Sequence, residues 1–319
     1  MQIARSLMVW CRRVVPPLLL AGLVSCGGGT SQIESFSPRQ IIPIGDETTG
    51  LLADGRRYGI NGLNAAGVFD CGQLPIWSQE LAANFGFPTD FCSGGVVGVT
   101  RAAAGAKVAD LDAQISAQIA ATGITAKDLF VVMVGLNDII ELYETYPGDR
   151  SCDTGVQNPA GGTLMGDIDA RGNQAAVQIS RILAAGGRAI VSTVHDLGYT
   201  PYALAKEALA PGQRTLLSCL TFRFNARVRV DIRPLDGRYW GLVLADDDTL
   251  AMVKSPSSFG IVNWTDAACA VAPPDCYTDK LVAGADAFNY LWADDRHFGP
   301  VLHSRLASDA ILRARNNPF

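Results

Sequence analysis

The sequence has few of the features that mark membrane-spanning, zinc-binding or nucleic-acid-binding proteins. It contains no run of about 18 consecutive apolar residues, the length that a membrane-spanning helix requires. No two of its 8 cysteines have CxxC spacing and it has only 3 histidines, so a zinc site is not indicated. Acidic residues outnumber basic ones, 31 to 26, which argues against nucleic acid as a partner.

The N-terminal segment is typical of an export signal. Three arginines precede an apolar run from Val14 to Val24 that is too short to cross a bilayer. The run ends in the letters LVSC, which resemble the bacterial lipobox, where the cysteine is lipidated and becomes the new N-terminus. We therefore expect residues 1–25 to be a lipoprotein signal peptide and Cys26 to carry the lipid. An ordinary signal peptide with a cysteine at this place by chance is the alternative.

Lipidation of Cys26 would place the protein in the bacterial cell envelope, outside the cytoplasm and, we expect, at the outer membrane. Residues 26–38, which include the letters GGGTSQ, would form a flexible tether, and residues 39–319 one domain with a large core. Once the first 25 residues are removed, 23 basic residues remain against 31 acidic ones. We therefore expect contact with a membrane through the lipid anchor and none with nucleic acid.

Six cysteines remain available for disulfides once Cys11 is removed with the signal peptide and Cys26 is lipidated. An even number fits an oxidising compartment outside the cytoplasm. The sequence leaves most pairings open, but Cys269 and Cys276 enclose the short loop CAVAPPDC and are the first candidates for a disulfide. The histidines show no zinc-type spacing with these cysteines, so we expect no metal ion and no cofactor.

Strand and helix patterns alternate along the mature chain. Apolar runs of strand length occur at 41–44, 129–134, 188–194 and 239–245, and helical spacing of apolar residues at 74–85, 108–119, 174–185, 216–230 and from 300 onward. This alternation predicts an α/β fold, a three-layer α/β/α sandwich with a central parallel sheet. The functional crevice should lie beyond the carboxyl ends of the strands. Irregular stretches at about 51–70 and 143–169 are long enough to form its walls.

Four short motifs stand where predicted strands end or helices begin. Gly45 and Asp46 follow the first strand, and Gly105 precedes a helix. The letters GLND, which begin at Gly135, follow the second strand, and the letters DDRH end at His297. This order resembles the GDSL or SGNH hydrolase family, whose four blocks supply a serine, a glycine, an asparagine and a histidine.

Further segments resemble the outer-membrane and autotransporter-type esterases of this family. They are the letters VHDLGYTPYA after the strand at 188–194, FRFNARV around Asn225, and SPSSFGIVNWTDAAC before Ala270. The resemblance covers the mature chain from about residue 39 to about residue 311. It implies the flavodoxin-like α/β/α fold of SGNH hydrolases.

The resemblance also implies a site for ester hydrolysis, which needs a nucleophile, a base, an acid that orients the base, and donors for the developing oxyanion. It assigns His297 as the base and Asp294 as the carboxylate that orients it. The oxyanion donors would be the backbone N–H groups of Gly105 and of position 47 and the side-chain amide of Asn137. The ligand would be an acyl ester or an acylated glycan or lipid.

The chain departs from the family pattern at the position of the nucleophile. Glu47 follows Gly45 and Asp46, where the family has serine, and Asp46 itself is expected to be structural. A carboxylate close to His297 favours the imidazolium form, which cannot act as a base. Its oxygen would also accept hydrogen bonds from the oxyanion donors and fill the place meant for the substrate. The sequence therefore argues against conventional esterase activity.

Two classes of function stay open. The first is an esterase with an altered mechanism, in which Glu47 activates water and His297 is the acid, or Thr48 or Thr49 is the nucleophile. The second is a pseudoenzyme whose former active-site crevice binds an acyl, sugar or protein ligand without turnover. The oligomeric state is open as well.

Several other noticeable residues are expected to be structural. Phe298 and Gly299 stand where the family usually has proline and threonine, which alters the expected start of the last helix. His195 and His303 lie outside the four blocks and are expected to pack or to lie on a helix surface. The acidic run 246–248 follows a strand and is interpreted as a solvated turn in preference to a calcium site.

Overall fold

The computed structural model describes residues 36–87, 92, 100–146, 152 and 162–316. The predicted signal peptide, the predicted lipidation site Cys26 and residues 26–35 of the predicted tether lie outside the described residues. Residues Ser35–Phe319 form a compact unit, the domain. Within the described ranges, no helix is long and apolar enough to cross a bilayer.

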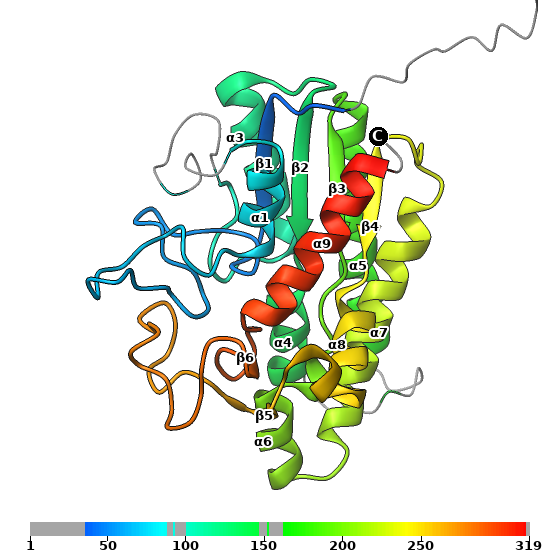
Figure 1. Cartoon of the computed structure of the whole chain (residues 1–319). Coiled ribbons are helices and arrows are strands. Elements are labelled where there is room, and N and C mark those ends of the chain that lie inside the picture. The colour runs from blue at the N-terminus through cyan, green and yellow to red at the C-terminus, as the bar shows by residue number, and fades with distance from the viewer. Residues whose placement is uncertain (1–35, 88–91, 93–99, 147–151, 153–161, 317–319) are drawn as a thin grey trace, which may run out of the picture. The chain divides into compact units, whose positions relative to one another are not determined.

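Four parallel strands form the central sheet, and they lie side by side in the order in which they occur along the chain (Figure 1). They are β1 (Gln40–Gly45), β2 (Asp128–Met133), β3 (Arg188–Ser192) and β4 (Trp240–Val243). Gly45 at the end of β1 pairs with Met133 at the end of β2. The chain therefore leaves both strands at one edge of the sheet, the carboxyl edge, where ligands bind in sheets of this kind.

Helices cover both faces of this sheet (Figure 1). One face packs against α3 (Leu111–Thr122), α4 (Leu136–Thr145), α5 (Leu164–Ala184) and α7 (Gln213–Ile232). The other packs against α1 (Trp77–Asn84), α8 (Ala245–Lys254) and α9 (Pro300–Asn316). In β2, Phe130 and Val132 point into the first core, and Leu129 and Val131 into the second. The predicted α/β/α sandwich with a central parallel sheet is confirmed.

Shorter elements complete the described domain. A second, two-stranded parallel sheet is formed by β5 (Asn263–Ala267) and β6 (Tyr290–Trp292). Figure 1 shows it, with α6 (Pro201–Leu209), near the carboxyl edge of the central sheet. Single turns of helix occur at η2 (Val108–Asp110), η3 (Leu197–Tyr199) and η4 (Pro256–Phe259).

The helix that we predicted at 174–185 is longer than expected. It begins at Leu164, because the hydroxyl of Thr163 accepts a hydrogen bond from the N–H of Gly166 and caps the first turn. The first turns of this helix are rich in glycine and aspartate, which hides their helical spacing of apolar residues. The prediction of an irregular stretch throughout 143–169 is therefore wrong, since its described ends are helical.

The acidic run 246–248 lies in the first turn of α8, so the prediction of a solvated turn is wrong. Carboxylates are favoured at this position because they face the positive end of the helix dipole. Asp246 also accepts hydrogen bonds from the hydroxyl of Thr193 at 2.7 Å and from Arg229 at 2.6 Å. These contacts tie the start of α8 to the end of β3 and to α7.

Residues 51–74 and residues 264–293, which include most of β5 and all of β6, form a small lobe beside the sheet, which we call the side lobe. The N–H of Asn61 in the first segment donates to the carbonyl of Cys276 in the second at 2.9 Å. A disulfide joins Cys269 to Cys276, which confirms the predicted pair. Sequence alone did not pair the other cysteines, and among the described residues they form the disulfides Cys71–Cys92 and Cys152–Cys219.

Candidate active site

The turn after β1, residues 45–49, carries Glu47, and we call it the Glu47 elbow. Gly45 has a φ of +111°, and a Cβ there would lie 1.9 Å from the carbonyl oxygen of Met133, so only glycine fits. The side chain of Gln114 accepts from the N–H of Gly45 at 2.7 Å and donates to its carbonyl at 2.9 Å. These contacts fix the direction in which the Glu47 side chain leaves the sheet.

The two threonines of the elbow are buried, and α1 holds their backbone. Trp77 Nε1–H donates to the carbonyl of Thr48 at 3.1 Å, and the hydroxyl of Ser78 donates to the carbonyl of Thr49 at 2.7 Å. The hydroxyl of Thr48 bonds to the carboxylate of Asp46. Thr48 and Thr49 are 2% and 0% exposed. This arrangement argues against a threonine nucleophile.

Both Gly105 and Asn137 direct their N–H groups at the side chain of Glu47. The N–H of Gly105 donates to Glu47 Oε2 at 2.8 Å, and Asn137 Nδ2 donates to the same oxygen at 3.0 Å. Asn137 lies in the first turn of α4, and the carboxylate of its neighbour Asp138 accepts from the N–H of Val108 at 2.9 Å. The loop that carries Gly105 is thereby tied to the helix that carries Asn137.

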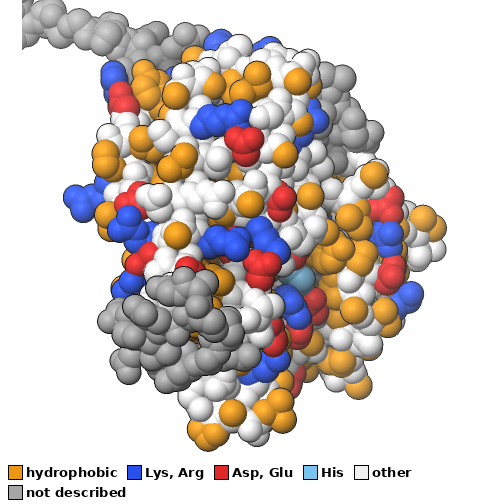
Figure 2. Space-filling view, turned by 180° about the vertical axis from the view of Figure 1, so that it is seen from behind, with side chains coloured by type: hydrophobic (Ala, Val, Ile, Leu, Met, Phe, Trp, Pro, Cys, Tyr) orange, Lys and Arg blue, Asp and Glu red, His pale blue; other side chains and the backbone are white. Residues whose placement is uncertain are grey.

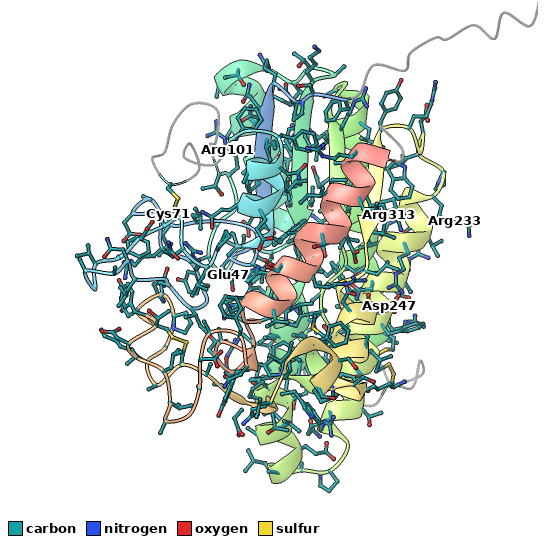
Figure 3. The ribbon with its side chains drawn as sticks, in the orientation of Figure 1. Glu47, Cys71, Arg101, Arg233, Asp247 and Arg313 are labelled. Carbon is teal, nitrogen blue, oxygen red and sulfur yellow. A yellow bond between two sulfur atoms is a disulfide. The ribbon has the colours of Figure 1, made fainter. Side chains whose placement is uncertain are left out.

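The turn between β6 and α9, residues 294–297, is called the histidine turn. Asp294 Oδ2 accepts from Nδ1–H of His297 at 2.8 Å, and Asp294 Oδ1 accepts from the backbone N–H of His297 at 2.6 Å. The other ring nitrogen, Nε2, lies 3.2 Å from Glu47 Oε1. Glu47 and His297 are 7% and 5% exposed. Figure 3 labels Glu47 beyond the end of β1, beside the start of α9.

Asp294, His297 and Glu47 form a buried row in which each group shifts the pKa of the next. Burial lowers the pKa of His297, but hydrogen bonds and charges from Asp294 and Glu47 outweigh it and raise the pKa to about 9. Burial raises the pKa of Glu47, but His297, together with the N–H groups of Glu47 itself and Gly105, lowers it below the ordinary value. For Asp294, too, burial is outweighed by His297, and the pKa is lowered. At neutral pH the row is carboxylate, imidazolium, carboxylate.

Asp46, the residue before Glu47 in the elbow, differs from Glu47 in charge. Burial, followed by the negative charge of Glu47, raises the pKa of Asp46 to about 8, although hydrogen bonds from Thr48 lower it. The side chain is 0% exposed, and its Oδ2 atom has no hydrogen-bond partner among the described residues. A neutral, fully buried carboxyl group of this kind fits the structural role that we expected.

All three histidines of the chain lie in one cluster around Phe298. The ring centroid of Phe298 is 4.3 Å from that of His303 and 5.1 Å from that of His195. Nδ1 of His303 accepts from the N–H of Trp77 at 3.3 Å. Burial, together with nearby positive charge, lowers the pKa of His303 well below its ordinary value, so His303 is neutral beside the charged His297.

Sequence reasoning missed Tyr58 of the side lobe. Its ring centroid lies 5.7 Å from that of His297, with the two planes inclined at 52°. The contact joins the side lobe to the distant histidine turn, and no local pattern in the sequence marks it. Gln114 was missed for the same reason, since its position in α3 gives no sign that it brackets the elbow.

No group of three or more His, Cys, Asp and Glu side chains that could hold a metal ion occurs in the part of the chain that the structure describes.

Charged side chains near the carboxyl edge form ion pairs with one another. Lys206 pairs with Glu144 at 2.6 Å, and Arg296 with Asp295 at 2.8 Å. Figure 2 shows histidine atoms at a small opening, with hydrophobic side chains on one side and intermixed basic and acidic side chains on the other.

The structure brings together all five residues singled out from the four blocks: Glu47, Gly105, Asn137, Asp294 and His297. A histidine with its orienting carboxylate and two N–H donors of the kind that ester hydrolysis uses are present, but this histidine is protonated at neutral pH. The two hydroxyls of the elbow, those of Thr48 and Thr49, are buried, and both donors are already bonded to Glu47. Their catalytic roles stay predictions.

Comparison with known proteins identifies the family. The sequence profile of the GDSL-like Lipase/Acylhydrolase family matches residues 27–310. A catalytic mutant of Axe2, an acetylxylan esterase from Geobacillus stearothermophilus, aligns at 16% identity and a TM-score of 0.43, covering 87% of this chain and 94% of that one. Another Axe2 mutant, described as an acetyl-xylooligosaccharide esterase from the same organism, aligns at 15% identity and a TM-score of 0.45. This alignment covers 89% of this chain and 96% of that one. No curated protein matches the sequence significantly. Because the profile match spans most of its length, the chain belongs to the GDSL-like lipase/acylhydrolase family.

Proposed function

We propose that this chain is a lipid-anchored envelope protein whose esterase-type crevice binds an acyl ester, or an acylated glycan or lipid, without conventional serine turnover. Family membership supports an acyl-ester ligand. One observation supports the absence of conventional serine turnover. Oε2 of Glu47, at the position where we expect the nucleophile, accepts both oxyanion-type hydrogen bonds, while Oε1 contacts His297.

Two consequences of this contact oppose serine-type chemistry. An ester carbonyl oxygen would find the donors of Gly105 and Asn137 already bonded, and each such donor contributes roughly 3 to 4 kcal/mol to transition-state stabilisation in enzymes where it has been tested. His297, with its pKa raised to about 9 by Asp294 and Glu47 against the effect of burial, is protonated at neutral pH. A protonated imidazole has no lone pair with which to accept a proton.

A second function is direct hydrolysis by water. Glu47 is ionised and could act as the base, while His297 is protonated and could act as the acid. This division of charge is the observation that favours it. The burial of Glu47 and its bonds to Gly105 and Asn137 weigh against it, because water must reach the carboxylate and the carboxylate must give up part of its hydrogen bonding.

The decisive experiment is an assay of the parent chain, Glu47→Ser, His297→Ala and the double variant Glu47→Ser/His297→Ala on short-chain nitrophenyl esters. We expect the parent to show no turnover and Glu47→Ser to hydrolyse the ester. Serine frees both donors, and loss of one carboxylate lowers the pKa of His297 toward the range of a base. The double variant should lose the activity again.

Each outcome of this assay separates the alternatives. Activity in the parent that His297→Ala abolishes would support hydrolysis by water and overturn the binding-only function. Silence in both the parent and Glu47→Ser, with ester binding also absent by calorimetry, would overturn the assignment of the site itself. Labelling of Thr48 by a serine-directed phosphonate would revive the threonine nucleophile.

The lipid anchor is tested separately. The apolar run from Val14 to Val24 and the following letters LVSC support lipidation of Cys26. We expect the parent chain to incorporate labelled palmitate and to sediment with membranes, and Cys26→Ala to do neither. A Cys26→Ala variant that still sediments with membranes would contradict the anchor.

A further inference from the structure

His195 makes a polar contact that packing does not require. It lies just beyond β3, is fully buried, and packs its ring against Trp292 and Phe298 with centroids 5.5 and 5.1 Å away. Its Nε2 atom lies 2.8 Å from the carbonyl oxygen of Arg296 in the histidine turn. A carbonyl oxygen can only accept a hydrogen bond, so Nε2 carries the ring proton and donates it.

The rest of the His195 ring has no hydrogen bond. Nδ1 is buried without a partner among the described residues, so in this tautomer it is an unsatisfied acceptor. Burial lowers the pKa of His195 to about 4, helped by the charge of His297 and opposed by the carbonyl of Arg296 and by Asp294. An apolar side chain would pack without leaving a nitrogen unsatisfied. The bond to Arg296 is therefore what distinguishes His195 from a packing residue.

The histidine turn depends on contacts from outside for its placement. The carboxylate of Asp294 accepts backbone N–H groups within the turn, which sets the shape of the turn but not its position against the sheet. From outside, the N–H of Tyr202 donates to the carbonyl of Asp295 at 2.8 Å. His195 donates to the next carbonyl, that of Arg296. These anchors, from α6 and from the end of β3, tie the turn to the carboxyl edge.

We propose that His195 is a positioning residue of this site, which holds the carbonyl of Arg296 and thereby sets the placement of His297 against Glu47. His195 does not touch Glu47 or the ligand position and acts through the backbone of the turn. The inference deepens the proposed function and rests on it, because the residue positioned is His297. It goes beyond the packing role that the sequence led us to expect.

The test compares side chains at position 195 that place a hydrogen-bond donor at different distances from the backbone. The amide nitrogen of glutamine lies near the place of Nε2 of the histidine, that of asparagine lies near the place of Nδ1, and leucine has no donor. The readout is the proton between His297 and Asp294, observed by NMR in the full chain with 15N-labelled histidine. In the parent this proton should resonate far downfield and exchange slowly with solvent.

We expect His195→Gln to keep the slow exchange, and His195→Leu and His195→Asn to speed it about tenfold, the factor that loss of about one hydrogen bond produces. His303→Leu is the matched control, since His303 is equally buried in the same cluster but bonds Trp77 and not the turn. It should lower the melting temperature and leave the exchange of the His297 proton unchanged.

Three results would show that His195 only packs. They are unchanged exchange in His195→Asn, no recovery in His195→Gln, and equal acceleration in His303→Leu. Should His195→Leu fail to fold, the comparison of glutamine with asparagine decides the question by itself. The NMR readout needs neither ester turnover nor a bound ligand. Failure of the proposed function in the ester assay is therefore distinguishable from failure of this inference.

Discussion

The Glu47 elbow and the histidine turn meet at 3.2 Å, but different kinds of contact hold them. The elbow is held by the positive φ of Gly45 and by neutral side chains that bond its backbone, those of Gln114, Trp77 and Ser78. The histidine turn is held by a charged side chain, Asp294, and by donors that bind its carbonyls from outside. The elbow should keep its shape whichever side chain stands at 47, whereas the turn depends on the ionisation of its own residues.

Because the contacts differ, the Glu47 elbow should tolerate substitutions better than the histidine turn does. The backbone of the elbow directs the side chain at position 47 toward the N–H groups of Gly105 and Asn137. A carboxylate side chain longer than serine can therefore accept both hydrogen bonds while the backbone of the elbow keeps its shape. The histidine turn has no comparable freedom, because Asp294 both shapes its backbone and pairs with its ring. Substitutions in the two halves should therefore differ in both size and kind of effect.

The largest effect should come from the histidine turn. On the Glu47→Ser background, we expect Asp294→Asn to lower kcat about 10⁴-fold, because an amide does not hold the catalytic tautomer of His297 or stabilise its charge. Hydrolysis of nitrophenyl acetate measures the change. Asp295→Asn is the matched control, since the carboxylate of Asp295 pairs with Arg296 and not with the ring of His297. Equal losses in the two variants would contradict the role of Asp294.

A smaller effect is expected on the elbow side. On the same background, Asn137→Ala should lower kcat about 10²- to 10³-fold, since it removes one oxyanion donor while the N–H of Gly105 remains. The melting temperature should change little relative to the loss of activity. Asn173→Ala, at an exposed asparagine of α5 that bonds Asp231, should leave kcat unchanged. A rise in KM with kcat unchanged would show that Asn137 binds the ligand without stabilising the transition state.

The third prediction concerns the stability of the parent chain against pH. The pKa of His297 is raised from 6.5 to about 9. Its contribution to stability is therefore present in full below pH 6.5 and is lost as the pH rises through 9, about 3 kcal/mol in all. Asp46, whose pKa is raised from 3.8 to about 8, adds a loss of stability as the pH rises from 3.8 to about 8. Glu47 and Asp294 act in the opposite direction, because their lowered pKa values withdraw stability as the pH falls into the acid range.

Urea denaturation of the parent and of Glu47→Gln between about pH 5 and about pH 10 measures this effect, since this range includes the ordinary pKa of His297, 6.5, and its raised value of about 9. Glutamine removes one carboxylate partner of His297 and the charge that raises the pKa of Asp46, so the loss of stability with rising pH should shrink. Parallel stability curves for the two proteins would show that the pair between Glu47 and His297 contributes nothing.

The fold and the centre of the site follow from local patterns in the sequence. Apolar runs of strand length predicted the parallel sheet, and parallel strands bring their carboxyl ends to one edge. The resemblance to the family, carried by short motifs at strand ends and helix starts, is why residues as distant in sequence as Glu47, Asn137 and His297 were expected together. The start of α5, the helical start of α8 and the contact of Tyr58 with the His297 ring were not foreseen. A side-chain cap, a helix dipole and a long-range ring contact decide these features.

The sequence by itself determined the α/β/α architecture, the pairing of Cys269 with Cys276, and the presence of a carboxylate at the end of β1. These depend on periodicity and on short spacings along the chain. Only the tertiary structure decided that Glu47 is ionised while its neighbour Asp46 is neutral. The physical reason is that a pKa depends on the degree of burial and on the distances to partners such as Gly105 and His297, which come from distant segments of the chain.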